Sequence, residues 1–192
     1  IADRGIDAYY HGPIGQAVVD IVQARGGPMQ MNDLQTYEVK WRNPVKGSYR
    51  GFEIVSMPLP SSGGLTILQM LMMLEKFDVR SMGSNSADTL QTMIEAMHLA
   101  YADRGKYMGD TDFVEVPMRG LLNPDYVATR SAMIDRSKAN PSVTPGDPWA
   151  YENAAPVTIP GGPGGHEGTE TTHFVVADKL GNVVAWTTTI EQ

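Results

Sequence analysis

The sequence has no cysteine, a minority of basic residues and few histidines. Without cysteine it has no disulfide scaffold, no Cys zinc site and no Cys nucleophile. Lys and Arg number 15 against 22 Asp and Glu, so the formal charge is 15 − 22 = −7, and no basic run is present. This charge argues against a nucleic-acid partner. The histidines, at 11, 98, 166 and 173, lack metal-ligand spacing, so neither a metal nor another cofactor is expected.

A long apolar run is also missing. The most apolar stretch, from Leu65 to Leu74, is roughly half the length that a membrane-spanning helix needs. The first four residues, Ile-Ala-Asp-Arg, are not a signal peptide. We therefore expect no membrane span. With 42% hydrophobic residues in 192, the chain can form the core of one large domain or of two small ones.

Periodicity predicts an α+β fold with at least four helices before residue 136. The helices are expected over 14–25, from Leu65 to about Phe77, from a Ser86 cap onward, and from Asn123-Pro124 to about Ile134. In the Ser86-capped helix one stripe is apolar: Leu90, Met93, Ile94, Met97 and Tyr101. Strands are expected at Tyr37–Trp41 and on both sides of Arg50-Gly51. The carboxylates Asp103, Asp110 and Asp112, with Arg104, are interpreted as ion-pairing and turn-capping residues.

The chain changes character after residue 138. Residues 139–170 are rich in Pro, Gly, Ser and Thr, and no Gly-Lys-Ser/Thr follows the glycines, which excludes a P-loop. Segments of this kind are usually functional or cleavable. We expect three parts: a helical part with a few strands over 1–138, a flexible segment over 139–170, and a β-hairpin within 171–192.

The hairpin gathers hydroxyl groups at its open end. A turn closed by Lys179 and Asn182, or by Asp178 and Val183, pairs residues whose numbers sum to 361, which sets Thr172 opposite Thr189. A plain alternative is that threonine is simply a favourable strand residue. A threonine hydroxyl becomes a strong nucleophile when a base lies beside it, and one such base is the residue's own freed α-amine. The hypothesis is an N-terminal threonine produced by cleavage between Glu170 and Thr171.

Ordered motifs along the whole chain resemble one enzyme family. They are Tyr9-Tyr10-His11-Gly12, Gly26-Gly27 with Asp33-Leu34 and Tyr37, Tyr49-Arg50-Gly51, Met57 to Gly64, Tyr101-Ala102-Asp103-Arg104, Gly109 to Phe113, and Thr171 to Glu191. The sequence resembles the γ-glutamyltransferases (γ-glutamyltranspeptidases), self-processing N-terminal nucleophile hydrolases of αββα fold. The matched region is the second half of the large subunit and the start of the small subunit.

The resemblance implies roles for individual residues. Thr171 matches the nucleophile and Thr189 the threonine that supports it, while Thr172 has a supporting role. Glu191 falls where the family places a side chain that contacts the donor's α-amino group. Glu170 and Thr171 flank the self-processing bond. Val175 departs from the usual Ser or Thr of the family, and we expect little effect from it.

The resemblance also implies a substrate and partners. The expected donor is a γ-glutamyl amide such as glutathione, in an enzyme made as a zymogen and found in the periplasm or secreted. The oxyanion hole would lie in the remainder of the small subunit, and the arginine for the donor's α-carboxylate in the first part of the large subunit. The present chain alone is therefore predicted to be uncleaved and inactive. Alternatives are a cephalosporin acylase, a poly-γ-glutamate enzyme, a non-catalytic homologue, or a serine hydrolase using Ser61 or Ser62.

Overall fold

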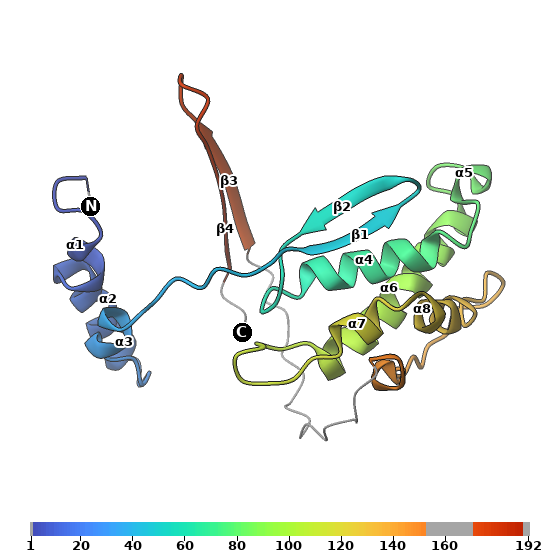
Figure 1. The fold of residues 1–192 in the computed structure, drawn as a ribbon, viewed down its shortest axis with the longest axis horizontal. Coiled ribbons are helices and arrows are strands. Elements are labelled where there is room, and N and C mark those ends of the chain that lie inside the picture. The colour runs from blue at the N-terminus through green and yellow to red at the C-terminus, as the bar shows by residue number, and fades with distance from the viewer. Residues whose placement is uncertain (1, 153–170, 190–192) are drawn as a thin grey trace. The chain divides into compact units, whose positions relative to one another are not determined.

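The computed structural model describes residues 2–152 and 171–189, with the backbone alone at 171–175 and 187–189. Two compact units make up the chain, one ending at Asn43 and the other beginning at Pro44 (Figure 1). Both units contain helices, and the described part of the second also contains two antiparallel hairpins. The α+β class expected from the sequence is confirmed.

The first unit consists of three helices. These are α1 (Asp7–Tyr10), α2 (Pro13–Ala24) and α3 (Met31–Gln35). Helix α2 begins with Pro13 in its first turn, as the fixed φ of proline favours. It ends just before Gly26, whose φ of +83° suits glycine and few other residues. Each helix contributes one buried apolar residue: Ala8, Val19 and Leu34.

The strand expected at Tyr37–Trp41 does not form. These residues have no regular secondary structure, and the Val39 and Trp41 side chains are 70% and 97% exposed. A strand needs a neighbouring strand for its backbone hydrogen bonds. None of the strands in the described parts of the chain pairs with this segment, so its alternating sequence has no sheet to join.

The second unit opens with the predicted hairpin around Arg50-Gly51. Strand β1 (Val45–Tyr49) pairs with β2 (Phe52–Ser56), and Tyr49 lies opposite Phe52. The two turn residues, Arg50 and Gly51, have φ values of 49° and 83°, as a two-residue turn of type I′ requires. The Arg50 guanidinium donates to the backbone oxygen of Phe77, which ties the turn to the segment after the next helix.

Over the described residues of this unit, five α-helices and one 3₁₀ helix follow. They are α4 (Gly63–Leu74), α5 (Val79–Met82), α6 (Ala87–Tyr107), α7 (Met118–Leu121), α8 (Pro124–Ser131) and η1 (Pro148–Tyr151). The predicted caps are confirmed, because the Ser86 hydroxyl accepts from the amide of Thr89 and the Asn123 side chain caps α8. Helix α4 contacts β1 and β2 as well as α6 and α8 (Figure 1). Among the described residues, no helix has the length and hydropathy to cross a membrane.

Helix α6 buries the face opposite its apolar stripe. The stripe residues Leu90, Met93, Ile94, Met97 and Tyr101 are 40–45% exposed. The buried face carries small residues, Ala96 and Ala100, together with the polar Glu95 and Asp103. Small side chains let α4 approach closely, and the polar ones find partners on other elements. The buried face of α6 is therefore set by hydrogen bonds to other elements and not by its apolar stripe.

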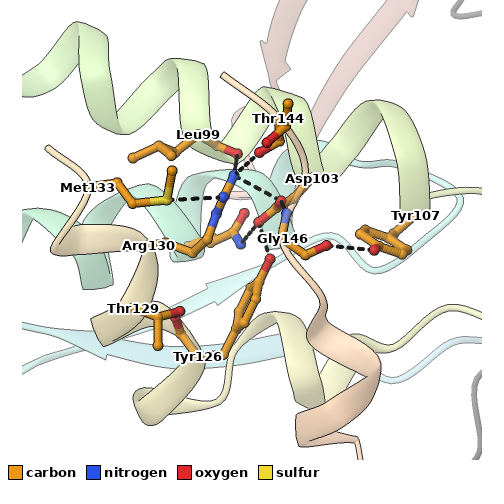
Figure 2. A network of polar contacts seen from close by, with 10 residues as sticks. Leu99, Asp103, Tyr107, Tyr126, Thr129, Arg130, Met133, Thr144 and Gly146 are labelled. Atoms are coloured by element: carbon orange, nitrogen blue, oxygen red, sulfur yellow. Dashed lines mark hydrogen bonds and ion pairs between the residues drawn. The ribbon is translucent and has the colours of Figure 1, made fainter. Parts of the chain in front are cut away.

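A buried carboxylate joins four parts of the second unit (Figure 2). Asp103, on α6, is fully buried. Its Oδ2 accepts from Gln69 Nε2 on α4 and from the Tyr126 hydroxyl on α8, both at 2.7 Å. Its Oδ1 accepts from Arg130 Nη2 at 3.0 Å and from the backbone amide of Gly146 at 2.9 Å. We call these five residues the Asp103 cluster. The ion-pairing role predicted for Asp103 is confirmed.

Removing the Asp103 carboxylate should strongly destabilise the second unit. Asp103→Ala leaves the Arg130 charge buried without its partner, and breaking a buried pair in this way costs about 3–5 kcal/mol. Asp88→Ala is the matched control, because Asp88 lies on the same helix and forms an exposed ion pair with Arg136. Exposed pairs contribute about 0.2–1 kcal/mol. Urea unfolding of the full-length variants measures both effects, and equal losses would contradict the assignment.

The cluster should also make the protein sensitive to alkaline pH. Burial, and then the hydrogen bond to Asp103, raise the pKa of Tyr126 far above its usual value. The stabilisation is complete below the unfolded pKa of about 10 and is lost as pH rises through the folded pKa. The melting temperature should therefore fall above about pH 10, and less steeply in Tyr126→Phe. Tyr101→Phe, which removes a more exposed phenol, should keep the wild-type slope.

Candidate functional site

The second hairpin carries the predicted nucleophile. Strand β3 (Thr171–Ala177) pairs antiparallel with β4 (Val183–Thr189), and Thr171 lies directly opposite Thr189. Both residues are at the open end of the hairpin, the last pair of its ladder. Directly opposite positions are the closest that two strands offer. The backbone thus brings together the two threonines assigned to nucleophile and support.

The register differs by one residue from the one that the sequence suggested. Paired residues sum to 360, not 361, so Thr172 lies opposite Thr188 instead of Thr189. The cause is the length of the turn, because Ala177 pairs with Val183 and five residues, 178–182, lie between them. An odd number of turn residues shifts every pair by one. The correction moves Thr189 from the partner of Thr172 to the partner of Thr171.

Asp178 sets this turn. Its Oδ1 accepts from the backbone amides of Leu180 and Asn182 at 2.8 and 3.0 Å, and its Oδ2 accepts from the Asn182 side chain at 2.7 Å. Gly181 has a φ of +86°, which completes the reversal. These bonds from Asn182, first from its side chain and then from its backbone, lower the pKa of Asp178. At neutral pH the turn is therefore held by a carboxylate.

Two other predicted site residues, Glu170 and Glu191, lie outside the described residues. Thr172, the expected supporting residue, is the second residue of β3. The described residues contain no group of three or more His, Asp or Glu able to hold a metal ion. The carboxylates near residue 110 serve a turn, as predicted, since Asp110 Oδ1 accepts from the amide of Asp112.

The loop before α4 is held through Ser62. Its Oγ accepts a hydrogen bond from Arg104 Nε at 2.8 Å. Gly64 is required by packing, because an added β-carbon would collide with the backbone oxygen of Met57. A tight turn into the helix, as the sequence indicated, accounts for this loop.

Comparison with known proteins identifies the family. The family model described as gamma-glutamyltranspeptidase matches residues 1–192. The chain belongs to the gamma-glutamyltranspeptidase family. One relative in this family, the glutathione hydrolase proenzyme of Bacillus subtilis (strain 168), is 43% identical over 193 residues, which cover all of this chain and 33% of that protein. The Acylase ACY 1 proenzyme of Pseudomonas sp. (strain SE83) is 40% identical over 190 residues, 99% of this chain and 31% of that protein.

Solved structures agree with this family. The gamma-glutamyltranspeptidase of Pseudomonas nitroreducens matches 76% of this chain and 44% of its own, with a TM-score of 0.70 and 32% identity. The chain spans about a third of the length of the Bacillus hydrolase and of the Pseudomonas acylase. It is therefore similar to part of a gamma-glutamyltranspeptidase.

The buried partners of Asp103 were not identified from the sequence. Arg130 is the clearest case, because its side chain is 4% exposed and pairs with Asp103. A signal was present: Tyr126, Val127, Arg130 and Ser131 are all buried and recur at helical spacing. An arginine within such a stripe indicates a buried ion pair, but periodicity alone does not name the partner.

Loss of the Asp178 carboxylate should loosen the β3–β4 hairpin. Asp178→Ala removes three hydrogen bonds from the turn, so the amides of both strands should exchange faster with deuterium. Because the pKa of Asp178 is lowered, the wild-type turn keeps this contribution at neutral pH and loses it as pH falls through that pKa. Hydrogen exchange read by mass spectrometry over 171–189 tests this. Lys179→Ala, at the next turn position, should leave exchange unchanged.

Proposed function

We propose that the intact protein is a self-processing γ-glutamyl hydrolase or transferase whose nucleophile is Thr171. The observation that supports this most is the pairing of Thr171 with Thr189 at the open end of the hairpin. Membership of the gamma-glutamyltranspeptidase family adds to it, as do relatives named proenzymes. The proposed whole fold is the αββα architecture of N-terminal nucleophile hydrolases, with the hairpin in its central sheet.

Self-processing would generate the nucleophile. Thr171 Oγ attacks the carbonyl carbon of Glu170, and the peptide nitrogen leaves as the α-amine of Thr171, so an ester replaces the amide. Water then hydrolyses the ester, which gives a carboxylate on Glu170 and restores the Thr171 hydroxyl. The freed α-amine serves as the base in later turnovers. Thr172 follows the nucleophile and has a supporting role.

Turnover would proceed through an acyl-enzyme. The Thr171 oxygen attacks the γ-carbonyl of a donor such as glutathione, and the hydroxyl of Thr189 orients the nucleophile through a hydrogen bond. Glu191 contacts the donor's α-amino group. The oxyanion hole and the arginine for the α-carboxylate belong to parts of the protein outside this chain, and water or an amine takes the acyl group.

A cephalosporin side chain is the alternative substrate. Two likenesses favour an acylase as the alternative: the 40% identity to the Acylase ACY 1 proenzyme, close to the 43% of the glutathione hydrolase, and the fold of a protein described as a cephalosporin acylase, matched with a TM-score of 0.64. Turnover of γ-glutamyl-p-nitroanilide against glutaryl-7-aminocephalosporanic acid by the intact protein separates the two. Faster turnover of the first supports the γ-glutamyl assignment.

Substitution of the two paired threonines tests the mechanism. In the full-length protein Thr171→Ala should leave one uncleaved chain and abolish amide hydrolysis, because the attacking oxygen is gone. Thr189→Ala should slow both cleavage and hydrolysis. Thr188→Ala is the matched control, since Thr188 lies opposite Thr172 and not opposite the nucleophile. Mass spectrometry and a chromogenic amide assay read both steps, and a Thr171→Ala protein that still splits would end the hypothesis.

A further inference from the structure

We propose that the Asp103 cluster, with Tyr107, anchors the irregular coil over 139–147 and is a positioning element for self-processing. The inference rests on the proposed function, because it concerns the chain that leads to the Glu170–Thr171 bond. It goes beyond that function by assigning a role to buried residues outside the hairpin.

Three contacts hold the backbone of this coil (Figure 2). Arg130 Nη2 donates to the backbone oxygen of Thr144 at 3.0 Å. The Gly146 amide donates to Asp103, and the Tyr107 hydroxyl donates to the Gly146 oxygen at 2.6 Å. All three side chains are 6% exposed or less, so water competes little for these bonds. The coil forms no strand or helix, and side chains therefore satisfy its backbone.

The anchored stretch continues to Glu152, the last described residue before the proposed cleavage site. Upstream, the amide of Asn140 donates to Glu95 at 3.0 Å. Downstream, the buried Trp149 of η1 belongs to the apolar cluster with Tyr107 and Tyr126. Glu152 then accepts from the backbone amide of Gly120 and from Arg119. The expected flexible segment began at residue 139, but the part of it over 140–152 is held at both ends.

Two glycines make this fit specific. A β-carbon at Gly146 would collide with the Tyr126 hydroxyl, and one at Gly120 would collide with the backbone oxygen of Pro148. Gly146 does not have a positive φ, so glycine is needed at this position because of the lack of space and not because of the backbone conformation. The coil lies against the cluster because its backbone has no side chain at the point of contact.

Anchoring reduces the number of residues between the last held position and the bond to be cleaved. From Glu152 to Thr171 the span is 171 − 152 = 19 positions, whereas from Ser131 at the end of α8 it would be 171 − 131 = 40. Self-processing requires the peptide before Thr171 to be held in one conformation. By the dependence of closure entropy on chain length, the shorter span favours that conformation by about threefold. Residues far from the bond thereby act on its cleavage.

Gly146→Ala in the full-length protein tests the anchor. The added methyl should displace the coil while every side chain of the cluster remains. Gly105→Ala is the matched control, because Gly105 lies between Asp103 and Tyr107 on α6 and an added β-carbon there meets nothing within 4 Å. We expect Gly146→Ala to split more slowly, by up to about threefold, with faster hydrogen exchange over 140–152. Once split, it should have wild-type kcat and KM.

Tyr107→Phe provides a second variant that keeps the ring packing and loses only the bond to Gly146. It should slow splitting in the same direction, by less than Gly146→Ala. Splitting of both variants at the wild-type rate would overturn the anchor and leave the proposed function intact. A parallel fall in melting temperature and in kcat of the split enzyme would also overturn it, since that pattern belongs to a general structural role. A wild-type protein that never splits would overturn the proposed function and the anchor together.

Discussion

The buried carboxylate of Asp103 is the constraint on which the second unit depends. Removing a charge from water costs several kcal/mol, and the cost is offset only when hydrogen bonds and an opposite charge surround the ion. Here four donors do so, from α4, α8 and the coil around Gly146. Each donor comes with its own element, so satisfying one ion fixes several elements at once. The cluster specifies an arrangement more than it adds net stability.

This constraint explains why the sequence predicted the helices but not the buried face of α6. Local signals, such as the Ser86 and Asn123 caps, determine where a helix begins. The apolar stripe with Leu90 and Met97 suggested the wrong buried face, because the partners of Asp103 lie on other elements. Tertiary contacts, and not the local sequence pattern, determine which face of α6 is buried. The same reason accounts for the segment around Trp41, whose alternation needs a strand elsewhere.

The β3–β4 hairpin shows how a local feature can still mislead by one residue. Its strands and its turn region were predicted, but the turn length depends on side-chain bonds from Asp178 that composition does not reveal. An even turn would have separated Thr171 from Thr189, and the odd turn pairs them. The family resemblance assigned both threonines without using the register. The backbone register pairs the same two threonines that the resemblance names.

The threonine pair and the anchored coil depend on the sequence in different ways. The paired threonines are 189 − 171 = 18 positions apart, and a single hairpin places them together. The anchor instead contacts backbone atoms of the coil, at Thr144 and Gly146, so most side chains of the coil take no part in it. Only a residue without a β-carbon fits at Gly146. A coil held in this way can vary in composition while its backbone stays in place, so the proposed positioning of the peptide before Thr171 is separate from the proposed chemistry at Thr171.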